Sequence, residues 1–201
     1  MIRNIIFDLG NVLVKFGWED YLKSYNFEPE KEAAIAKALF AGPYWKELDR
    51  EVLPLDELKE LFVSLAPQYR EDVISVFEQS DHCISQFDYA VPWIQNLKNQ
   101  GLHLYYLSNY SGLMVKRTQQ QLNFLPLMEG GLFSYEVKQV KPDPEIFQSF
   151  LERFPQIRPE ESVFFDDSAA NVDTARRLGF HAVCFTDHEQ AVTELSALLN
   201  S

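Results

Sequence analysis

The stretch IIFDLGN, residues 5–11, decides the fold of this chain, because an apolar run ends there in a carboxylate and a turn. Branched and aromatic residues in so short a run favour a buried strand over a helix. Gly10 and Asn11 tolerate unusual backbone angles and therefore indicate a turn directly after that strand. Asp8 is expected at the carboxyl end of a central strand, where open α/β sheets bind ligands. An ordinary turn residue is the alternative interpretation of Asp8 taken alone.

Residues 18–80 change to a helical pattern and contain no strand signal. Strong helix formers, amphipathic spacing and Gly or Pro stops are typical of helices. The predicted helices cover residues 19–22, 30–40, 55–62 and 70–79. We expect a small helical bundle inserted after the first strand, which itself covers residues 2–7.

From residue 89 onward, apolar strands alternate with helices. The predicted strands cover residues 102–107, 132–137, 162–165 and 180–185, and the helices cover 89–100, 111–122, 144–154, 169–178 and 189–199. Asp143 is expected to cap the helix that starts at Pro144. This alternation implies a parallel sheet covered by helices on both faces. The predicted fold class is α/β: a Rossmann-like doubly wound parallel sheet core with an inserted α-helical bundle.

Composition limits the partners of the chain. Its 201 residues are 46% hydrophobic, which is enough for a substantial core, and its formal net charge is -12. Nucleic acid and anionic membrane both attract basic patches, so the expected partner is a small molecule and neither of these. Cys83 and Cys184 fit no metal-ligand spacing and are interpreted as small buried hydrophobes, which suits a reducing, cytoplasmic setting. Asp8 interrupts the first apolar run too early for a signal peptide, and no stretch approaches the ~20 apolar residues of a membrane span.

Polar residues follow the predicted strands at one edge of the sheet. Asp8 ends the first strand, Ser108 and Asn109 end the second, and the pair at 166–167 ends the third, while Lys141 precedes a helix. Each alone is commonly a helix cap or a solvated charge. In a doubly wound sheet, however, these ends converge on one crevice. Three carboxylates there repel one another unless a cation sits among them, and hard oxygen ligands suit Mg²⁺.

Chemistry suggests a role for each of these groups. Asp8, isolated on the turn, can attack phosphorus and form an aspartyl-phosphate. Lys141 can neutralise the carboxylate and the phosphoryl charge. The Ser108 hydroxyl and the backbone N–H groups after it can bind phosphate oxygens. Asp166 and Asp167 would then hold the metal.

Four motifs together resemble the haloacid dehalogenase superfamily. They are FDLGNV at 7–12, LSN at 107–109, VKPD at 140–143 and FFDDSAAN at 164–171. Their order and spacing cover nearly the whole chain. The helical block between the first two motifs resembles the mobile cap of that family, which implies a core domain of residues 1–15 plus 86–201 and a cap domain of residues 16–85. The nearest likeness is to cytoplasmic sugar-phosphate phosphatases, α-glucose-1-phosphate phosphatases among them.

The resemblance implies roles residue by residue. Asp8 would be the nucleophile and a metal ligand, and Lys141 would lie beside it. The remaining metal ligands would be the Gly10 carbonyl, Asp167 directly, and Asp166 directly or through water, with Asn171 supporting that loop. The phosphate contacts would be Asn11, Ser108, Asn109 and Lys141.

Gly10 departs from the family pattern, which usually has a second Asp there as general acid and base. General acid–base catalysis typically contributes about 10²–10⁴-fold, so the loss matters. A water molecule at the metal or a residue of the cap are the candidates to replace that Asp. Restriction to good leaving groups, such as anomeric or acyl phosphates, and slow catalysis are the other consequences that the departure allows.

Residues of the cap are expected to select the substrate. Four aromatic residues fall near its entrance and tip: Phe16, Trp18, Tyr44 and Trp45. Stacking on a sugar face and ordinary core packing both remain open for them. Three cations fall on the same side and are either substrate contacts or a solvated face: Lys15, Lys46 and Arg50.

The sequence therefore favours a Mg²⁺-dependent phosphatase that hydrolyses a small phosphorylated metabolite, expected to be a sugar phosphate, through an aspartyl-phosphate. One alternative is a catalytically weak phosphate-ligand sensor or scaffold, with Gly10 as the reason for lost chemistry. Another is a metal-independent 2-haloacid dehalogenase, against which the carboxylate pair at 166–167 argues. The expected assembly is a monomer or homodimer.

Overall fold

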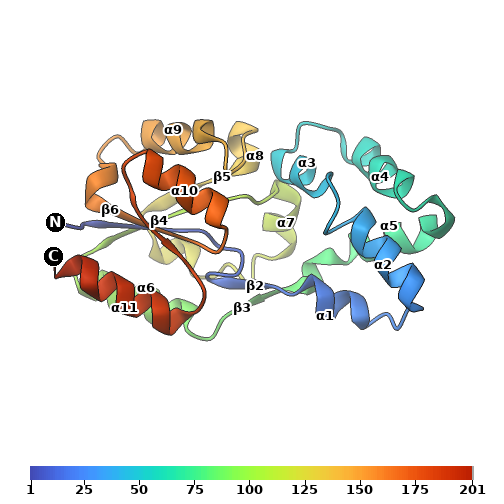
Figure 1. Ribbon diagram of the computed structural model, residues 1–201, viewed down its shortest axis with the longest axis horizontal. Coiled ribbons are helices and arrows are strands. Elements are labelled where there is room, and N and C mark those ends of the chain that lie inside the picture. The colour runs from blue at the N-terminus through green and yellow to red at the C-terminus, as the bar shows by residue number, and fades with distance from the viewer. Residues whose placement is uncertain (201) are drawn as a thin grey trace.

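A five-stranded parallel sheet forms the centre of the computed structural model, which describes residues 1–200 (Figure 1). The strand order is β5-β4-β1-β6-β7. The strands are β1 (Asn4–Phe7), β4 (His103–Ser108), β5 (Gly130–Phe133), β6 (Ser162–Asp166) and β7 (His181–Cys184), and every neighbouring pair runs parallel. The predicted α/β class with a parallel sheet is confirmed. The stretch that carries Asp8 is the central strand.

Both faces of the sheet are covered, which explains why β1 is apolar without interruption. Ile5 and Phe7 pack into one core cluster, whereas Ile6 points into the other. Helices α6 (Ala90–Asn99) and α11 (His188–Leu199) bury apolar side chains in the first cluster, and α9 (Pro144–Arg153) and α10 (Ala169–Arg177) in the second. These two pairs lie on opposite sides of the sheet in Figure 1.

A helical block, residues 18–83, lies beyond one end of the sheet (Figure 1). It contains α1 (Trp18–Lys23), α2 (Pro29–Ala38), α3 (Trp45–Arg50), α4 (Leu55–Ser64) and α5 (Arg70–Glu78). Two short antiparallel strands, β2 (Val14–Phe16) and β3 (Ile84–Gln86), lead into and out of it. Helix α7 (Gly112–Arg117) follows β4, and the 3-10 turns are η1 (Pro67–Tyr69), η2 (Ser80–Cys83), η3 (Leu125–Leu127) and η4 (Pro159–Glu161).

The strand predicted at residues 132–137 is wrong from Ser134 onward. The chain leaves the sheet after Phe133 and forms α8 (Ser134–Val137). The Glu136 carboxylate accepts a hydrogen bond of 2.8 Å from the Phe133 N–H, which closes the first turn of that helix. The alternation of apolar and polar residues predicts a strand here, although a helix begins at Ser134.

One further helix prediction needs correction, and the predicted N-cap position of Asp143 is confirmed, although without a capping bond. The helix predicted at 111–122 ends at Arg117, where the Thr118 hydroxyl donates to the Met114 carbonyl and competes with the helical hydrogen bonds. Asp143 occupies the N-cap position of α9 but makes no capping bond, because its carboxylate accepts from the Arg50 guanidinium at 3.3 Å. Strands β2 and β3 and helix α3 were not predicted, since three to six residues show no periodicity.

Two features bear on the environment of the chain. Within residues 1–200, no helix has both the length and the apolar character to cross a membrane. Cys83 and Cys184 form no disulfide; Cys83 is buried and Cys184 is partly exposed.

Candidate active site

Three carboxylates meet at the carboxyl edge of the sheet. Parallel pairing sets Phe7 of β1 beside Phe165 of β6, so the residues that follow both strands become neighbours. Asp8 lies directly after β1, Asp166 ends β6 and Asp167 follows it. One oxygen from each of the three carboxylates lies within 4.8 Å of the others. The sequence-predicted cluster is thus brought together in space.

Lys141 supplies the cation of this cluster. Its side chain is 1% exposed, and its Nζ lies 2.9 Å from Asp8 Oδ1 and 2.5 Å from Asp166 Oδ2. The Asn109 side chain fixes the Lys141 backbone, since its amide donates to the Lys141 carbonyl at 3.0 Å and its oxygen accepts from the Lys141 N–H at 2.8 Å. Burial lowers the pKa of Lys141, but the charges of Asp166 and Asp8 outweigh it, so the pKa is raised and the ammonium persists.

Asp8 is held by donors on one oxygen only. Its Oδ1 accepts from the Ser108 hydroxyl and from the Leu9 N–H, each at 2.7 Å, besides Lys141. No described residue donates a hydrogen bond to Oδ2. Burial raises the pKa of Asp8 to about 7; Lys141 and Ser108 oppose this rise, and the neighbouring carboxylates of Asp166 and Asp167 add to it.

Asp166 and Asp167 differ in the number of hydrogen bonds that their carboxylates accept from the protein. The buried Asp166 accepts from the Ser168 N–H at 2.9 Å and from the Asn171 amide at 2.8 and 3.0 Å, in addition to Lys141. The more exposed Asp167 accepts a single side-chain hydrogen bond, from Asn11 at 2.9 Å. Asp167 therefore has the greater free capacity for a cation. Burial raises the pKa of Asp167, while the Asn11 bond lowers it.

The turn after β1 has the conformation that its sequence indicates. Asn11 adopts a left-handed φ of 55°, and its side-chain oxygen accepts from the Phe16 N–H at 3.1 Å. Its side chain therefore ties the turn to Asp167 and to β2, leaving little capacity for a phosphate. A Cβ built on Gly10 would meet no atom within 4 Å, so space does not exclude a larger residue there.

A cavity of about 200 Å³ opens over this cluster. The core contributes Asp8, Gly10, Asn11, Asn109, Tyr110, Met114 and Asp167 to its lining, and the connecting strands and helical block contribute Phe16, Ile84, Trp45 and Asp49. Of the four aromatic residues considered for substrate contact, Phe16 and Trp45 line the cavity. Trp18 does not; it stacks on Phe40 with ring centroids 5.4 Å apart.

Asp49 is the acidic residue of the cavity that the sequence pattern did not single out. It lies on α3, a helix too short to be predicted. Its only local signal is its place between apolar Leu48 and basic Arg50, shortly after Trp45. That signal does not distinguish it from other acidic residues of the block.

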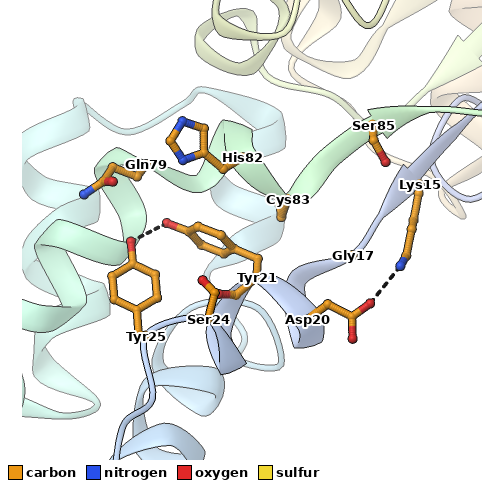
Figure 2. A pocket seen from close by; sticks show the side chains of 10 residues that line it. All are labelled: Lys15, Gly17, Asp20, Tyr21, Ser24, Tyr25, Gln79, His82, Cys83 and Ser85. Carbon is orange, nitrogen blue, oxygen red and sulfur yellow. Dashed lines mark hydrogen bonds and ion pairs between the residues drawn. The ribbon is translucent and has the colours of Figure 1, made fainter.

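A larger hollow of about 490 Å³ lies at the base of the helical block (Figure 2). Its cation, Lys15, is paired with Asp20 at 2.8 Å, and Tyr21 and Tyr25 bond to each other at 2.7 Å. The hollow holds no cluster of carboxylates. Its lining residues offer neither a metal site nor an unpaired Lys or Arg for a phosphate, so the smaller cavity is the better candidate for the active site.

The donor set of the smaller cavity fits a divalent cation. Three carboxylates and one ammonium carry a net charge of -2 when all are ionised. A divalent ion cancels that charge, and Mg²⁺ takes oxygen ligands of this kind while leaving positions for water and phosphate oxygens. The residues that could hold it are Asp8, Asp167 and the Gly10 carbonyl, with Asp166 already bonded to Lys141.

Comparisons with known proteins agree with this geometry. The model of a family described as haloacid dehalogenase-like hydrolase matches residues 2–179. A D-ribitol-5-phosphate phosphatase from Bacteroides thetaiotaomicron is 25% identical over 215 residues, spanning 100% of both chains. A phosphorylated carbohydrates phosphatase from Thermotoga maritima is 23% identical over 188 residues, covering 89% of this chain and 82% of that protein.

One solved structure supports the fold independently. It is an enzyme of the same family from Bacteroides thetaiotaomicron in complex with magnesium and inorganic phosphate. It superposes with a TM-score of 0.70 at 20% identity and covers 95% of this chain and 99% of that one.

Proposed function

Because the chain belongs to the haloacid dehalogenase-like hydrolase family, we propose that it is a Mg²⁺-dependent phosphatase acting on a small, sugar-like phosphate ester. The reaction would pass through an aspartyl-phosphate on Asp8. The observation that carries this proposal is the buried cluster itself: three carboxylates whose oxygens lie within 4.8 Å, with the Lys141 ammonium 2.9 Å from Asp8. Such a cluster is costly to bury unless it serves charge chemistry.

The residues of the chain divide the work as follows. An oxygen of Asp8 attacks phosphorus, and Lys141 and Ser108 hold the carboxylate in place through their bonds to Oδ1. Mg²⁺, when bound, neutralises charge on the phosphoryl oxygens. Asp8, the Gly10 carbonyl and Asp167 would hold it, and Asp166 would support them by fixing Lys141.

The phosphoryl group is expected to meet Asn11, Ser108 and Asn109 as well as Lys141. The side chains of Asn11 and Asn109 are engaged with Asp167 and with the Lys141 backbone, and the Asn11 N–H donates to the Val14 carbonyl. The Gly10 N–H of that turn and N–H groups of the loop after β4 are therefore the expected donors. In this proposal the two asparagine side chains hold the loops in position, and the loop backbones bind the phosphate.

The cavity limits the substrate. Its volume of about 200 Å³ lies below the ~300–1,000 Å³ of common ligand pockets, which favours a phosphoryl group that carries a small organic residue. The relatives named for ribitol 5-phosphate and for phosphorylated carbohydrates fall in that class. We propose that residues 16–85 act as a cap domain that closes over the substrate, on a core of residues 1–15 plus 86–201. The enzyme would work in the cytoplasm, where two unpaired cysteines are stable, as a monomer or homodimer.

Removal of the metal tests this function. Wild-type protein is expected to release inorganic phosphate from polyol and sugar phosphates in Mg²⁺ and to lose at least about 10²-fold of that rate in EDTA, since the cluster then keeps its negative charge. Phosphate release from a panel of esters, followed by recovery on adding Mg²⁺, measures it.

Two outcomes would contradict the proposal. Binding of inorganic phosphate with no turnover of any ester would favour a sensor. Chloride release from a 2-haloacid in EDTA would favour a dehalogenase.

A further inference from the structure

The missing carboxyl group at Gly10 leaves a chemical gap. An alkyl phosphate ester expels an alkoxide, which needs a proton, and the water that later attacks phosphorus must lose one. Gly10 can do neither, although the space for a side chain exists there. If the proposed phosphatase activity is correct, a water molecule at the metal or another side chain of the cavity carries the proton.

Few groups of the cavity can exchange a proton. The titratable side chains that line it are Asp8, Asp49, Tyr110 and Asp167. Asp8 and Asp167 belong to the nucleophile and metal cluster. The Tyr110 hydroxyl is bonded to the Thr118 hydroxyl at 2.8 Å, and burial raises its pKa. Asp49 is the remaining candidate.

Asp49 is held over the cavity by contacts between α3 and the core. Helix α3 packs against α8 (Figure 1), and the Ser134 hydroxyl donates to the Asp49 carbonyl at 2.7 Å. On either side in the chain, Arg50 reaches Asp143 at 3.3 Å and Glu51 accepts from the Leu113 N–H at 3.0 Å. Asp49, Arg50 and Glu51 thus each connect the end of α3 to the core.

The Asp49 carboxyl itself has no partner. It is 8% exposed, and within residues 1–200 nothing donates to it or pairs with it. A buried acidic side chain without a partner is costly in a protein, so its presence beside the nucleophile calls for a use. A proton donor needs such freedom, because its oxygen must be available to the leaving group.

The surroundings of Asp49 favour its acid form. Burial and, to a lesser degree, the charge of Asp8 raise the pKa of Asp49 to about 8, against the opposing charges of Lys141 and Lys46. Tyr110 is the other titratable group coupled to it, and it is uncharged at neutral pH. A carboxyl kept protonated at neutral pH is a recurring design for a general acid.

We propose that Asp49, carried by the helical block, is the catalytic general acid and base that replaces the carboxyl group absent at Gly10. In the first step, an Asp8 oxygen bonds to phosphorus, the bond from phosphorus to the ester oxygen breaks, and that oxygen takes the Asp49 proton and leaves as the alcohol. In the second step, water bonds to phosphorus, the bond from phosphorus to the Asp8 oxygen breaks, and Asp49 accepts a proton of that water, so phosphate leaves with Asp8 again a carboxylate and Asp49 again an acid.

The donor therefore arrives with the cap. When the block closes on the core, the contact from Ser134 sets Asp49 in the cavity; when it opens, the proton donor departs with it. Closure would then assemble the catalytic site only around a bound substrate, which limits wasteful transfer to water.

Asp49→Asn separates proton donation from binding through the nature of the leaving group. In Mg²⁺, phosphoryl-enzyme formation from ribitol 5-phosphate is expected to slow by about 10²–10⁴-fold. Formation from acetyl phosphate is expected to stay within a few-fold of wild type, because acetate leaves without a proton. Single-turnover trapping of the phosphorylated enzyme measures both rates. Slower hydrolysis should also let that species accumulate from acetyl phosphate.

Equal losses on the two substrates would overturn the inference, because a structural or binding role does not sense the leaving group. Asp56→Asn, which changes an exposed carboxyl group of the same block, is the matched control and should leave both rates unchanged. If wild type formed no phosphoryl-enzyme from either substrate, the proposed function itself would fail.

Two variants protect the test against misfolding. Asp49→Glu keeps a proton donor and should recover part of the loss. Gly10→Asp added to Asp49→Asn places a carboxyl group in the free space at Gly10 and should recover activity on ribitol 5-phosphate. Failure of both, with the variants folded by circular dichroism, would count against Asp49 as the proton carrier.

The pH profile gives a second readout. In wild type, turnover of ribitol 5-phosphate should fall as pH rises through about 8, because Asp49 then loses the proton it donates. Acetyl phosphate should not show this limb in phosphoryl-enzyme formation, and Asp49→Asn should abolish it. An unchanged alkaline limb in Asp49→Asn would assign it to another group.

Discussion

Asp8→Asn is expected to lower the rate of phosphate release by on the order of 10⁴-fold or more, which is the scale seen when a covalent nucleophile is removed. The amide has nearly the shape of the carboxylate and can keep the bond from the Ser108 hydroxyl. It cannot, however, attack phosphorus, and it removes one negative charge from the cluster that holds the metal. Both effects act on the chemical step.

The measurement is phosphate release in saturating Mg²⁺, with the phosphoryl-enzyme assayed in parallel. Removal of a buried carboxylate from a crowded cluster should not destabilise the fold, so the melting temperature in EDTA should be unchanged or higher. Asp56→Asn again serves as the control for loss of one acidic group. Retention of full activity by Asp8→Asn would remove Asp8 from the mechanism.

Lys141→Ala is expected to lower the free energy of unfolding by about 3–5 kcal/mol in EDTA and to abolish activity. Among the described residues, the ammonium is the sole cation paired with this cluster, through Asp8 and Asp166. Without it, these two buried carboxylates lose their counter-charge, and the site keeps only negative charge. Saturating Mg²⁺ should restore part of the stability but not the phosphoryl contact.

Urea unfolding at neutral pH measures this loss. The pKa of Lys141 is raised above the model-peptide value of 10.5, so its contribution to stability is complete at neutral pH and is lost only as pH rises through the folded-state value. Lys37→Ala, at an exposed lysine of α2, should change stability by less than about 0.5 kcal/mol. Equal effects of the two substitutions would show that the buried ion pairs carry no net stability.

Much of the core could be predicted because its signals are local. The run that ends in Asp8 and the run that ends in the 166–167 pair are apolar, short and followed by turn residues. Parallel strands in one sheet present their carboxyl ends together, so the convergence of these groups follows from strand order alone. The order and spacing of the motifs therefore predicted the carboxylate cluster and its lysine. They did not predict that the side chains of Asn11 and Asn109 bond to neighbouring site residues.

The short elements could not be predicted, for a definite physical reason. Helix α3 and strands β2 and β3 are too brief to show a period, and their stability comes from packing against α8 and against each other. The strand expected at 132–137 failed likewise, because the Glu136 bond to the Phe133 backbone outweighs an alternating pattern.

The sequence by itself determined the α/β core, the family and the set of groups that gather around Asp8, because each depends on residues within a few positions of a strand end. Only the tertiary structure decided which residue of the helical block enters the cavity. Asp49 is one of many acidic residues of the block, and what distinguishes it is burial together with the bond from Ser134, 85 positions away in the chain. Contacts of that separation leave no local pattern, since they are selected by packing of one domain on another.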